Sequence, residues 1–311
     1  MPFLTIFSAP KPFTDPHVAI IQRNAIRSWL HLGDEVEVLL VGDEPGLSQV
    51  ATELGVRQLP QVQRNEQGTP LVSSIFDLAR QASQSPLLAY LNADILAMPD
   101  LVSAAQQVAE HEDRFLIIGQ RWDLDVRQEL DFDHGWPERL RLDVQKSGAL
   151  HRPAGSDYFI FPKALYTEMP GFAIGRAGWD NWTIYHARRS GWAVVDATAS
   201  VMIVHQSHDY SHLPGGKAHY NLDESQKNMD IGGGIAHMYT VLEANRCLVN
   251  GSVRPVPLTL PRLLRQVELR LAGDSGKPQG IRRTLWRRVR RLRRKVVRLS
   301  LEQTLPAGSE G

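Results

Sequence analysis

A carboxylate and an amide follow a buried-looking strand in the first third of the chain. Residues 87–91 are apolar, and Asn92 and Asp94 come directly after them. In open α/β sheets ligands bind beyond the carboxyl ends of the parallel strands, so these side chains lie where a ligand is expected. Hard divalent cations prefer oxygen ligands, and a cation here could hold a diphosphate. The alternative is an ordinary Asx turn after a strand.

Histidine is concentrated in a short segment after an apolar strand, at His205, His208 and His212. His208 and His212 have the spacing of one helix face, and a zinc site needs several such donors. The surrounding residues form helices poorly, however, and no cysteine lies nearby. We therefore expect His205 to join Asp94 on a mixed oxygen and nitrogen metal site. Loop hydrogen bonding is the expectation for His212.

Two acids in the second half of the chain lie beside aromatic residues. Asp180 lies at a loop-to-helix junction between Trp179 and Trp182, and Asp157 precedes Tyr158. An aspartate at such a junction is a common helix N-cap. Apolar rings around a carboxyl also raise its pKa and make it usable as a general base. Asp180 is therefore either a helix cap or a base.

The elements that position these residues alternate along the first 120 residues. Strands are expected at 3–9, 36–41, 56–59, 87–91 and 115–119, with helices between them. This alternation predicts an α/β fold with a mostly parallel sheet flanked by helices. Polar residues follow several of the strands, so a ligand cleft is expected at one sheet edge. These residues are Asp43, Glu44, Asn92, Asp94, Arg121 and His205.

Composition limits the classes of protein. A chain of 311 residues with 42% hydrophobic content can bury a substantial core, as one large domain or two small ones. A single cysteine, Cys247, excludes an internal disulfide framework and fits a reducing compartment. The first residues do not have the pattern of a signal peptide, and no apolar run is long enough to span a bilayer. The expected location is cytoplasmic.

The net charge of +1 conceals a sharp division. Residues 281–298 contain ten Lys or Arg and no acid, whereas residues 1–280 carry 32 acids and 25 bases. An apolar stripe at helical spacing runs through the basic segment: Ile281, Leu285, Val289, Leu292, Val296 and Leu299. Such a helix suits an anionic membrane surface, which is the preferred partner. Nucleic acid is the competing partner and is not expected, and packing on the body is the remaining alternative.

This pattern divides the chain into four parts. Residues 1–250 are expected to form the main domain, and the proline- and glycine-containing residues 251–280 a connector. Residues 281–301 are expected to form the basic amphipathic helix, and 302–311 a disordered tail.

Taken together and in this order, the polar clusters resemble those of the nucleotide-sugar glycosyltransferases of the GT-A fold. More narrowly, they are similar to those of the family-two kind. The resemblance covers about residues 3–245. The matching pieces are Ser8-Ala9-Pro10, Gly42-Asp43-Glu44, Asn92-Ala93-Asp94, Gly178-Trp179-Asp180-Asn181 and His205. The chain has Asn92 where the first aspartate of the metal motif is common.

The resemblance implies a GT-A-like, Rossmann-type mixed sheet and a hexosyltransferase that uses a nucleotide-sugar with Mn²⁺ or Mg²⁺. Asp94 and His205 would be the metal ligands and Asp180 the base of an inverting reaction. The expected donor-binding residues are Ser8, Ala9, Asp43, Glu44, Asn92 and Arg121, and the expected acceptor-binding residues are Asp157, Tyr158 and Trp179. The acceptor would be a glycan or a lipid-linked glycan, in polysaccharide biosynthesis at the inner face of the membrane.

Two other functions stay open. One is a catalytically silent module of the same fold that binds nucleotide or glycan at the membrane, for which Asn92 and the Asp180-Asn181 pair leave room. The other is a metal hydrolase built on the histidines at 205–212.

Overall fold

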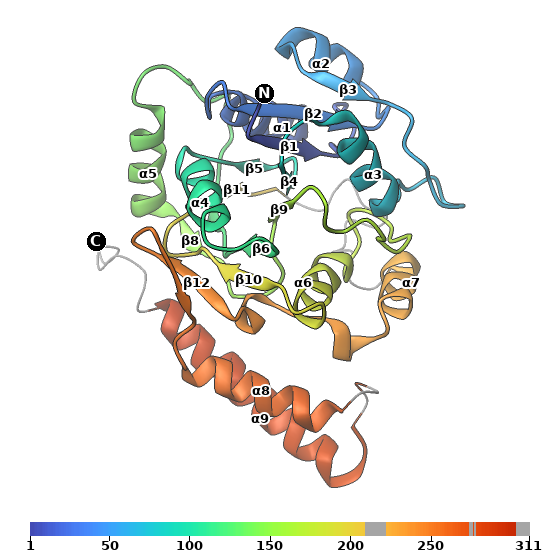
Figure 1. Cartoon of the computed structure of the whole chain (residues 1–311), viewed down its shortest axis with the longest axis vertical. Helices are drawn as coiled ribbons and strands as arrows, with labels where there is room; N and C mark the ends of the chain where they lie inside the picture. The colour runs from blue at the N-terminus through green and yellow to red at the C-terminus, as the bar shows by residue number, and fades with distance from the viewer. Residues whose placement is uncertain (209–221, 274–275, 277, 303–311) are drawn as a thin grey trace.

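The computed structural model describes residues 1–208, 222–273, 276 and 278–302. Its centre is a nine-stranded sheet in the order β13-β12-β10-β6-β9-β4-β1-β2-β3 (Figure 1). The strands are β1 (Leu4–Ser8), β2 (Val36–Val41), β3 (Arg57–Leu59), β4 (Leu87–Leu91), β6 (Phe115–Ile118), β9 (Tyr158–Pro162), β10 (Ala193–Asp196), β12 (Arg246–Val249) and β13 (Ser252–Pro255). The predicted mixed α/β fold with a central sheet and flanking helices is confirmed.

Two parallel blocks make up most of the sheet. Strands β4, β1, β2 and β3 run parallel to one another, and so do β6, β10 and β12. Strand β9 lies between the blocks and is antiparallel to both β4 and β6. The sheet is therefore mostly parallel, with antiparallel β9 at its centre and antiparallel β13 at one edge.

Successive side chains of each strand enter two separate cores. On β4, Leu87 and Ala89 face one core, and Leu88 and Tyr90 face the other. The first core is covered by α1 (Pro16–Leu30), α2 (Leu47–Leu54) and α4 (Asp100–Ala109), and the second by α3 (Val72–Ala82) and α6 (Trp179–Arg189). Because both faces are covered, the central strands read as apolar runs in the sequence.

A second sheet of four short strands positions the histidines. Its order is β5 (Ile95–Leu96), β11 (Val204–Gln206), β7 (Trp122–Leu124) and β8 (Ala149–Leu150), with α5 (Trp136–Ser147) packed against it. β11 pairs with β5, so that His205 lies opposite Ile95, the residue after Asp94. Strand pairing thus brings together two residues that are far apart in the chain.

The C-terminal part differs from its expected division. The residues expected to form a connector contain β13 and helix α8 (Leu260–Ala272), which packs along α9 (Gly280–Glu302). Pro261 occupies the first turn of α8 and Gly273 its C-cap, so these residues mark helix ends rather than a linker. The predicted basic helix is present as α9. Residues 303–311 of the expected tail lie outside the described residues.

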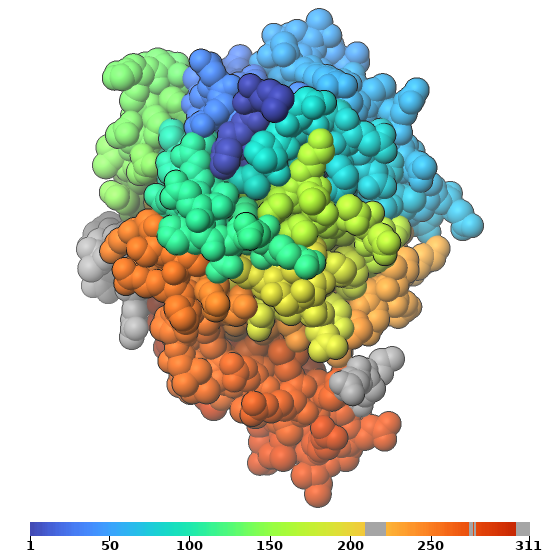
Figure 2. Space-filling view, in the orientation of Figure 1, coloured from blue at the N-terminus to red at the C-terminus, as the bar shows by residue number. Residues whose placement is uncertain are grey.

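Helices α8 and α9 form a C-terminal hairpin that stands at one end of the molecule (Figure 2). Among the described residues, three short helical elements lie between β11 and β12: α7 (Asp223–Ile231), η3 (Ile235–His237) and η4 (Val241–Glu243). In the described part of the chain, every helix is too short or too polar to cross a bilayer.

Candidate functional site

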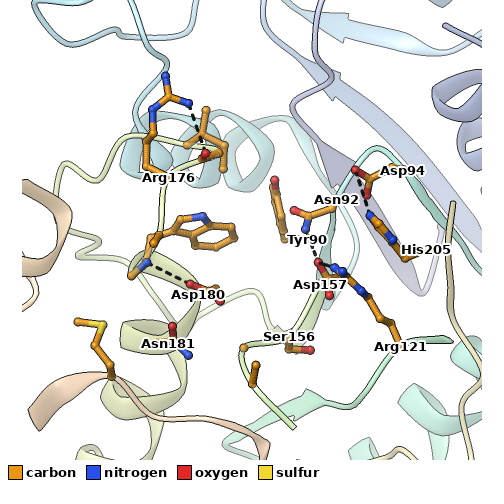
Figure 3. A pocket seen from close by; sticks show the side chains of 18 of the residues that line it. Tyr90, Asn92, Asp94, Arg121, Ser156, Asp157, Arg176, Asp180, Asn181 and His205 are labelled. Carbon is orange, nitrogen blue, oxygen red and sulfur yellow. Dashed lines mark hydrogen bonds and ion pairs between the residues drawn. The ribbon is translucent and has the colours of Figure 1, made fainter. Parts of the chain in front are cut away.

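A cavity of about 980 Å³ lies beyond the ends of β1, β4 and β6. It is lined by the loops after these strands, by the first turn of α6, and by the α8–α9 hairpin. Asp94, His205 and Asp180 all line it. The structure therefore brings the three residues on which the expected chemistry depends to one cavity (Figure 3).

Asp94, His205 and His208 form a set of candidate metal ligands. One ligand atom of each residue lies within 4.8 Å of the other two. His208 Nε2 is 3.1 Å from Asp94 Oδ2, and His205 Nε2 is 4.0 Å from the same oxygen. Asp94 Oδ1 is buried and has no hydrogen-bond partner among the described residues. One carboxylate and two imidazoles are suitable ligands for a divalent cation. A bound cation would also give the buried Asp94 Oδ1 a partner.

The surroundings of Asp94 hold its carboxylate ionised. Burial alone would raise its pKa, but the hydrogen bond with His208 and the charges of His205 and Lys11 bring the pKa well below its usual range. The Lys11 ammonium lies 3.8 Å from Asp94 Oδ2 and 3.3 Å from His208 Nε2. Burial lowers the pKa of Lys11, and the Asp94 charge opposes that effect. This end of the cavity therefore carries a lysine that could contact an anionic ligand.

Asp123 lies beside His205 in a half-buried polar network. His205 Nδ1 is 3.0 Å from Asp123 Oδ1, which leaves Nε2 directed at Asp94. Asp123 also accepts a hydrogen bond from Arg121 Nε (2.9 Å) and lies 2.8 Å from His151 Nδ1. Metal-binding histidines commonly have a carboxylate on the second ring nitrogen, which fixes the tautomer and the ring orientation.

Asp157 links this network to the middle of the cavity. It accepts hydrogen bonds from Asn92 Nδ2 and Arg121 Nη1, both at 2.8 Å. Its backbone oxygen also accepts from the Asn92 N–H. Asn92 therefore acts in the described structure as a donor that holds Asp157. An aspartate at position 92 would face Asp157 with a like charge.

Asp180 lies at the opposite side of the cavity in Figure 3. The N-cap of α6 is Gly178, and Asp180 is in the first turn, where its Oδ1 accepts from the Gly178 N–H at 3.3 Å. Burial raises the pKa of Asp180 to about 6, and the charge of Asp157 acts in the same direction. A carboxyl with this pKa can accept a proton near neutral pH. The expected helix-cap role belongs to Gly178.

The close approach of Asp180 to the neighbouring loop requires a glycine. A Cβ placed on Gly155 would lie 1.8 Å from Asp180 Oδ2. The carboxylate therefore rests directly against the backbone of the loop that carries Asp157.

Most of the predicted site residues line this cavity. They are Ala9, Glu44, Asn92, Asp94, Arg121, Asp157, Trp179, Asp180 and His205. The structure differs from the prediction at three residues. Ser8 is buried in β1 and donates to Leu91 O. Tyr158 is buried in the core, because the strand that follows Asp157 turns it away. Asp43 is exposed and is not part of the cavity lining, although its ion-pair partner Arg64 is.

Three residues were missed by the sequence analysis. His208 was considered only for a zinc site with His212, which lies outside the described residues, and not as a ligand beside Asp94. Lys11 lies in the loop after the first strand, and Asp123 lies two residues after Arg121. The concentration of histidine was the signal for His208. Neither Lys11 nor Asp123 has a comparable signal in the sequence.

Comparisons with known proteins give remote structural likenesses. No family model matches the chain, and no curated protein matches it in sequence. A mannosyltransferase from Pyrobaculum calidifontis, solved with GDP-Man and Mn²⁺, is 15% identical with a TM-score of 0.41. The match covers 65% of this chain and 56% of that one, so this chain spans about half of its length.

A glucosyl-3-phosphoglycerate synthase from Mycobacterium tuberculosis, solved with Mg²⁺ and UDP, is 14% identical with a TM-score of 0.46. That match covers 83% of this chain and 89% of the other. At these identities and TM-scores the likeness carries no functional argument, and the function is inferred from the residues of the site.

Proposed function

We propose that the protein is a glycosyltransferase that moves a sugar from a nucleotide-sugar donor to an acceptor hydroxyl. The observation that carries the proposal is one cavity with two chemically distinct sides. One side has the Asp94, His205 and His208 ligand set with Lys11 beside it, and the other has Asp180 with a raised pKa. A leaving diphosphate needs positive charge, and an attacking hydroxyl needs a base across the sugar from it.

Asp94, His205 and His208 would hold Mn²⁺ or Mg²⁺, and Lys11 would contact the diphosphate directly. When bound, the cation neutralises charge that develops on the leaving diphosphate. Two imidazole ligands in a set of three favour Mn²⁺ over Mg²⁺, which prefers oxygen and water. The matched mannosyltransferase and synthase were solved with Mn²⁺ and Mg²⁺, respectively.

Asp180 would take the acceptor proton in a single displacement. The hydroxyl oxygen bonds to the anomeric carbon, the bond from that carbon to the diphosphate oxygen breaks, and the proton passes to the Asp180 carboxylate. The nucleoside diphosphate leaves on the opposite face, so the anomeric configuration inverts. NMR analysis of the product anomer tests this step, and retention would contradict it.

The remaining lining residues divide between the two substrates in this proposal. Ala9, Glu44, Asn92 and Arg121 would lie along the donor, and Trp179 and Asp157 near the acceptor. A glycan or lipid-linked acceptor fits a protein at the inner surface of a membrane. The exposed apolar residues of α9 support that location: Ile281, Leu285, Leu292 and Leu299 are each at least 43% exposed and alternate with arginines.

A ligand screen tests the donor half of the proposal. The melting temperature would be measured with UDP-, GDP-, CMP- and dTDP-sugars, with and without Mn²⁺, because a ligand that binds the native state raises it. We expect one nucleotide class to raise it in a Mn²⁺-dependent manner. Asp94→Asn should remove that response, whereas the exposed-surface control Asp34→Asn should keep it. The absence of any response to all four donors would contradict the proposal.

A further inference from the structure

The C-terminal hairpin packs on the body through charged side chains. Arg262, Arg265 and Glu268 of α8 are buried, whereas Leu263 and Val267 of the same helix are 40% and 41% exposed. The two arginines donate hydrogen bonds to carboxylates and carbonyl oxygens of the body. The usual burial pattern of an amphipathic helix is therefore inverted in α8. Ion pairs attach the hairpin, and its apolar side stays open.

Three arginines of the hairpin meet around one buried carboxylate and line the cavity. Arg265 Nη1 and Arg293 Nε lie 3.2 and 2.7 Å from Glu268, and Arg290 Nε lies 3.8 Å from it. Glu243, 2.8 Å from Arg265, is the second carboxylate of this cluster. Three cations thus face two carboxylates. Arg290 Nε is buried without a hydrogen-bond partner among the described residues.

Arg290 is the least compensated of the three. Burial lowers its pKa, and the charges of Arg294, Arg293 and Arg265 lower it further against the opposing charge of Glu268. Its guanidinium lies 4.8 Å from the ring centre of Trp286, which also lines the cavity. The ring holds the guanidinium in place, while an anion at this position would relieve the repulsion.

Contacts through Met238 and Gly178 connect this cluster to the Asp180 side of the cavity. Arg265 Nη2 donates to Met238 O at 2.8 Å. Met238 Sδ lies 3.6 Å from where a Cβ on Gly178 would be, and the Gly178 N–H bonds to Asp180. Asp94 and His205 lie across the cavity from Asp180 in Figure 3. The basic cluster is therefore on the side of the cavity assigned to the acceptor.

We propose that Arg265, Arg290 and Arg293 form a phosphate subsite for the acceptor. This proposal rests on the proposed function, because it takes the acceptor to occupy the side of the cavity at Asp180. The acceptor then carries a phosphate or diphosphate that binds the hairpin and a hydroxyl that reaches Asp180. Guanidinium groups bind phosphate oxygens in pairs, which gives such a subsite both affinity and orientation.

The hairpin also indicates where the phosphate comes from. The helix that brings Arg290 and Arg293 into the cavity exposes Leu285 and Leu292 to solvent, at 43% and 49%. If this apolar face lies on a bilayer, the cavity opens beside the lipid headgroups. A lipid-borne phosphate could then enter the subsite without leaving the membrane surface.

Binding of inorganic pyrophosphate to the full chain in EDTA tests the subsite. Arg290→Gln removes one cation from the cluster, and Arg288→Gln, an exposed arginine of the same helix outside the cavity lining, is the matched control. We expect about tenfold weaker binding for Arg290→Gln and little change for Arg288→Gln, as a lost charge-assisted bond implies. Equal affinities of the two variants would overturn the proposal. Arg293→Gln, with urea unfolding measured alongside, provides a second variant.

A vesicle experiment distinguishes the two sources of phosphate. Co-sedimentation would be compared on vesicles of phosphatidylcholine alone and of phosphatidylcholine with phosphatidic acid. A larger loss for Arg290→Gln than for Arg288→Gln on phosphatidic acid assigns the subsite to a lipid phosphate. Equal losses, with the pyrophosphate difference retained, assign it to a water-soluble phosphate. Because pyrophosphate binding in EDTA needs neither donor nor turnover, its result is independent of the donor screen.

Discussion

Replacing Asp180 by asparagine tests two properties of its carboxyl group: the effect of its ionisation on stability and its role as the catalytic base. In the folded protein its pKa is about 6, against an ordinary value of 3.8. A raised pKa means that folding favours the protonated form. Its contribution to stability is fully present below pH 3.8 and is lost as the pH rises through about 6. Ionised Asp180 therefore destabilises the protein at neutral and alkaline pH, and asparagine cannot ionise.

The magnitude follows from the shift. A difference of about two pKa units corresponds to about 3 kcal/mol at pH 8 and to about half of that at pH 5. Because Asp180 retains some solvent exposure, these are upper values. We expect the gain of Asp180→Asn over the parent protein to be larger at pH 8 than at pH 5 by about 1 kcal/mol. The Gly178 N–H can still donate to the amide oxygen, so the α6 turn is kept.

The assay is urea unfolding at the two pH values in EDTA without donor, with Asp34→Asn as an exposed control. In parallel, turnover should rise with pH through about 6 in the parent protein and fall by about 10²–10⁴-fold in Asp180→Asn, with donor binding retained. An equal stability change at both pH values would refute the burial argument. Retained turnover in the variant, or a flat pH profile of the parent, would refute the assignment of Asp180 as the base.

Two further predictions concern the supports of the site, and a third concerns the exposed apolar face of α9. Gly155→Ala should lower turnover about 100-fold with donor binding kept, because its Cβ displaces the Asp180 carboxylate; steady-state kinetics check this, and unchanged kcat would contradict it. Asp123→Asn should weaken Mn²⁺ binding by about 10–100-fold in calorimetry, since His205 loses its orienting carboxylate; unchanged affinity would exclude that role. Leu285→Ser with Leu292→Ser should reduce flotation with anionic liposomes about tenfold without changing the urea midpoint, and equal flotation would rule out anchoring through this face.

The sheet was predictable because its signals are local. Apolar runs such as 87–91 end at polar or turn residues, and helices with one apolar face separate them. The central place of β9 was not predictable in this way. Its apolar sequence fits a parallel or an antiparallel strand equally well, and only the packing of the two parallel blocks decides between them.

The chemistry of the site was predictable from the sequence, but the full set of residues that form it was less so. Asp94 and His205 follow strands, so sheet topology carries them to one edge. His208 lies two residues beyond β11, where the direction of a side chain depends on the local path of the backbone. Ser8 and Tyr158, which were expected to bind substrate, do not line the cavity for a related reason. Ser8 is the last residue of β1 and Tyr158 the first of β9, and both are buried, whereas the cavity-lining Ala9 and Asp157 lie one residue outside these strands.

The orientation of the α8–α9 hairpin on the body could not be predicted from the hydrophobic periodicity of the sequence. The apolar stripe of α9 was visible in the sequence, and such a stripe ordinarily marks the buried face of a helix. Here the neighbouring helix α8 is attached by Arg262 and Arg265, whose carboxylate partners Asp196 and Glu243 lie elsewhere in the chain. Those ion pairs turn the hairpin so that arginines of α9 enter the cavity while leucines of α9 face solvent. The orientation of the hairpin thus determines both which arginines line the cavity and which leucines face solvent. A substitution that breaks the ion pair between Arg265 and Glu243 should therefore weaken the binding of both phosphate and vesicles.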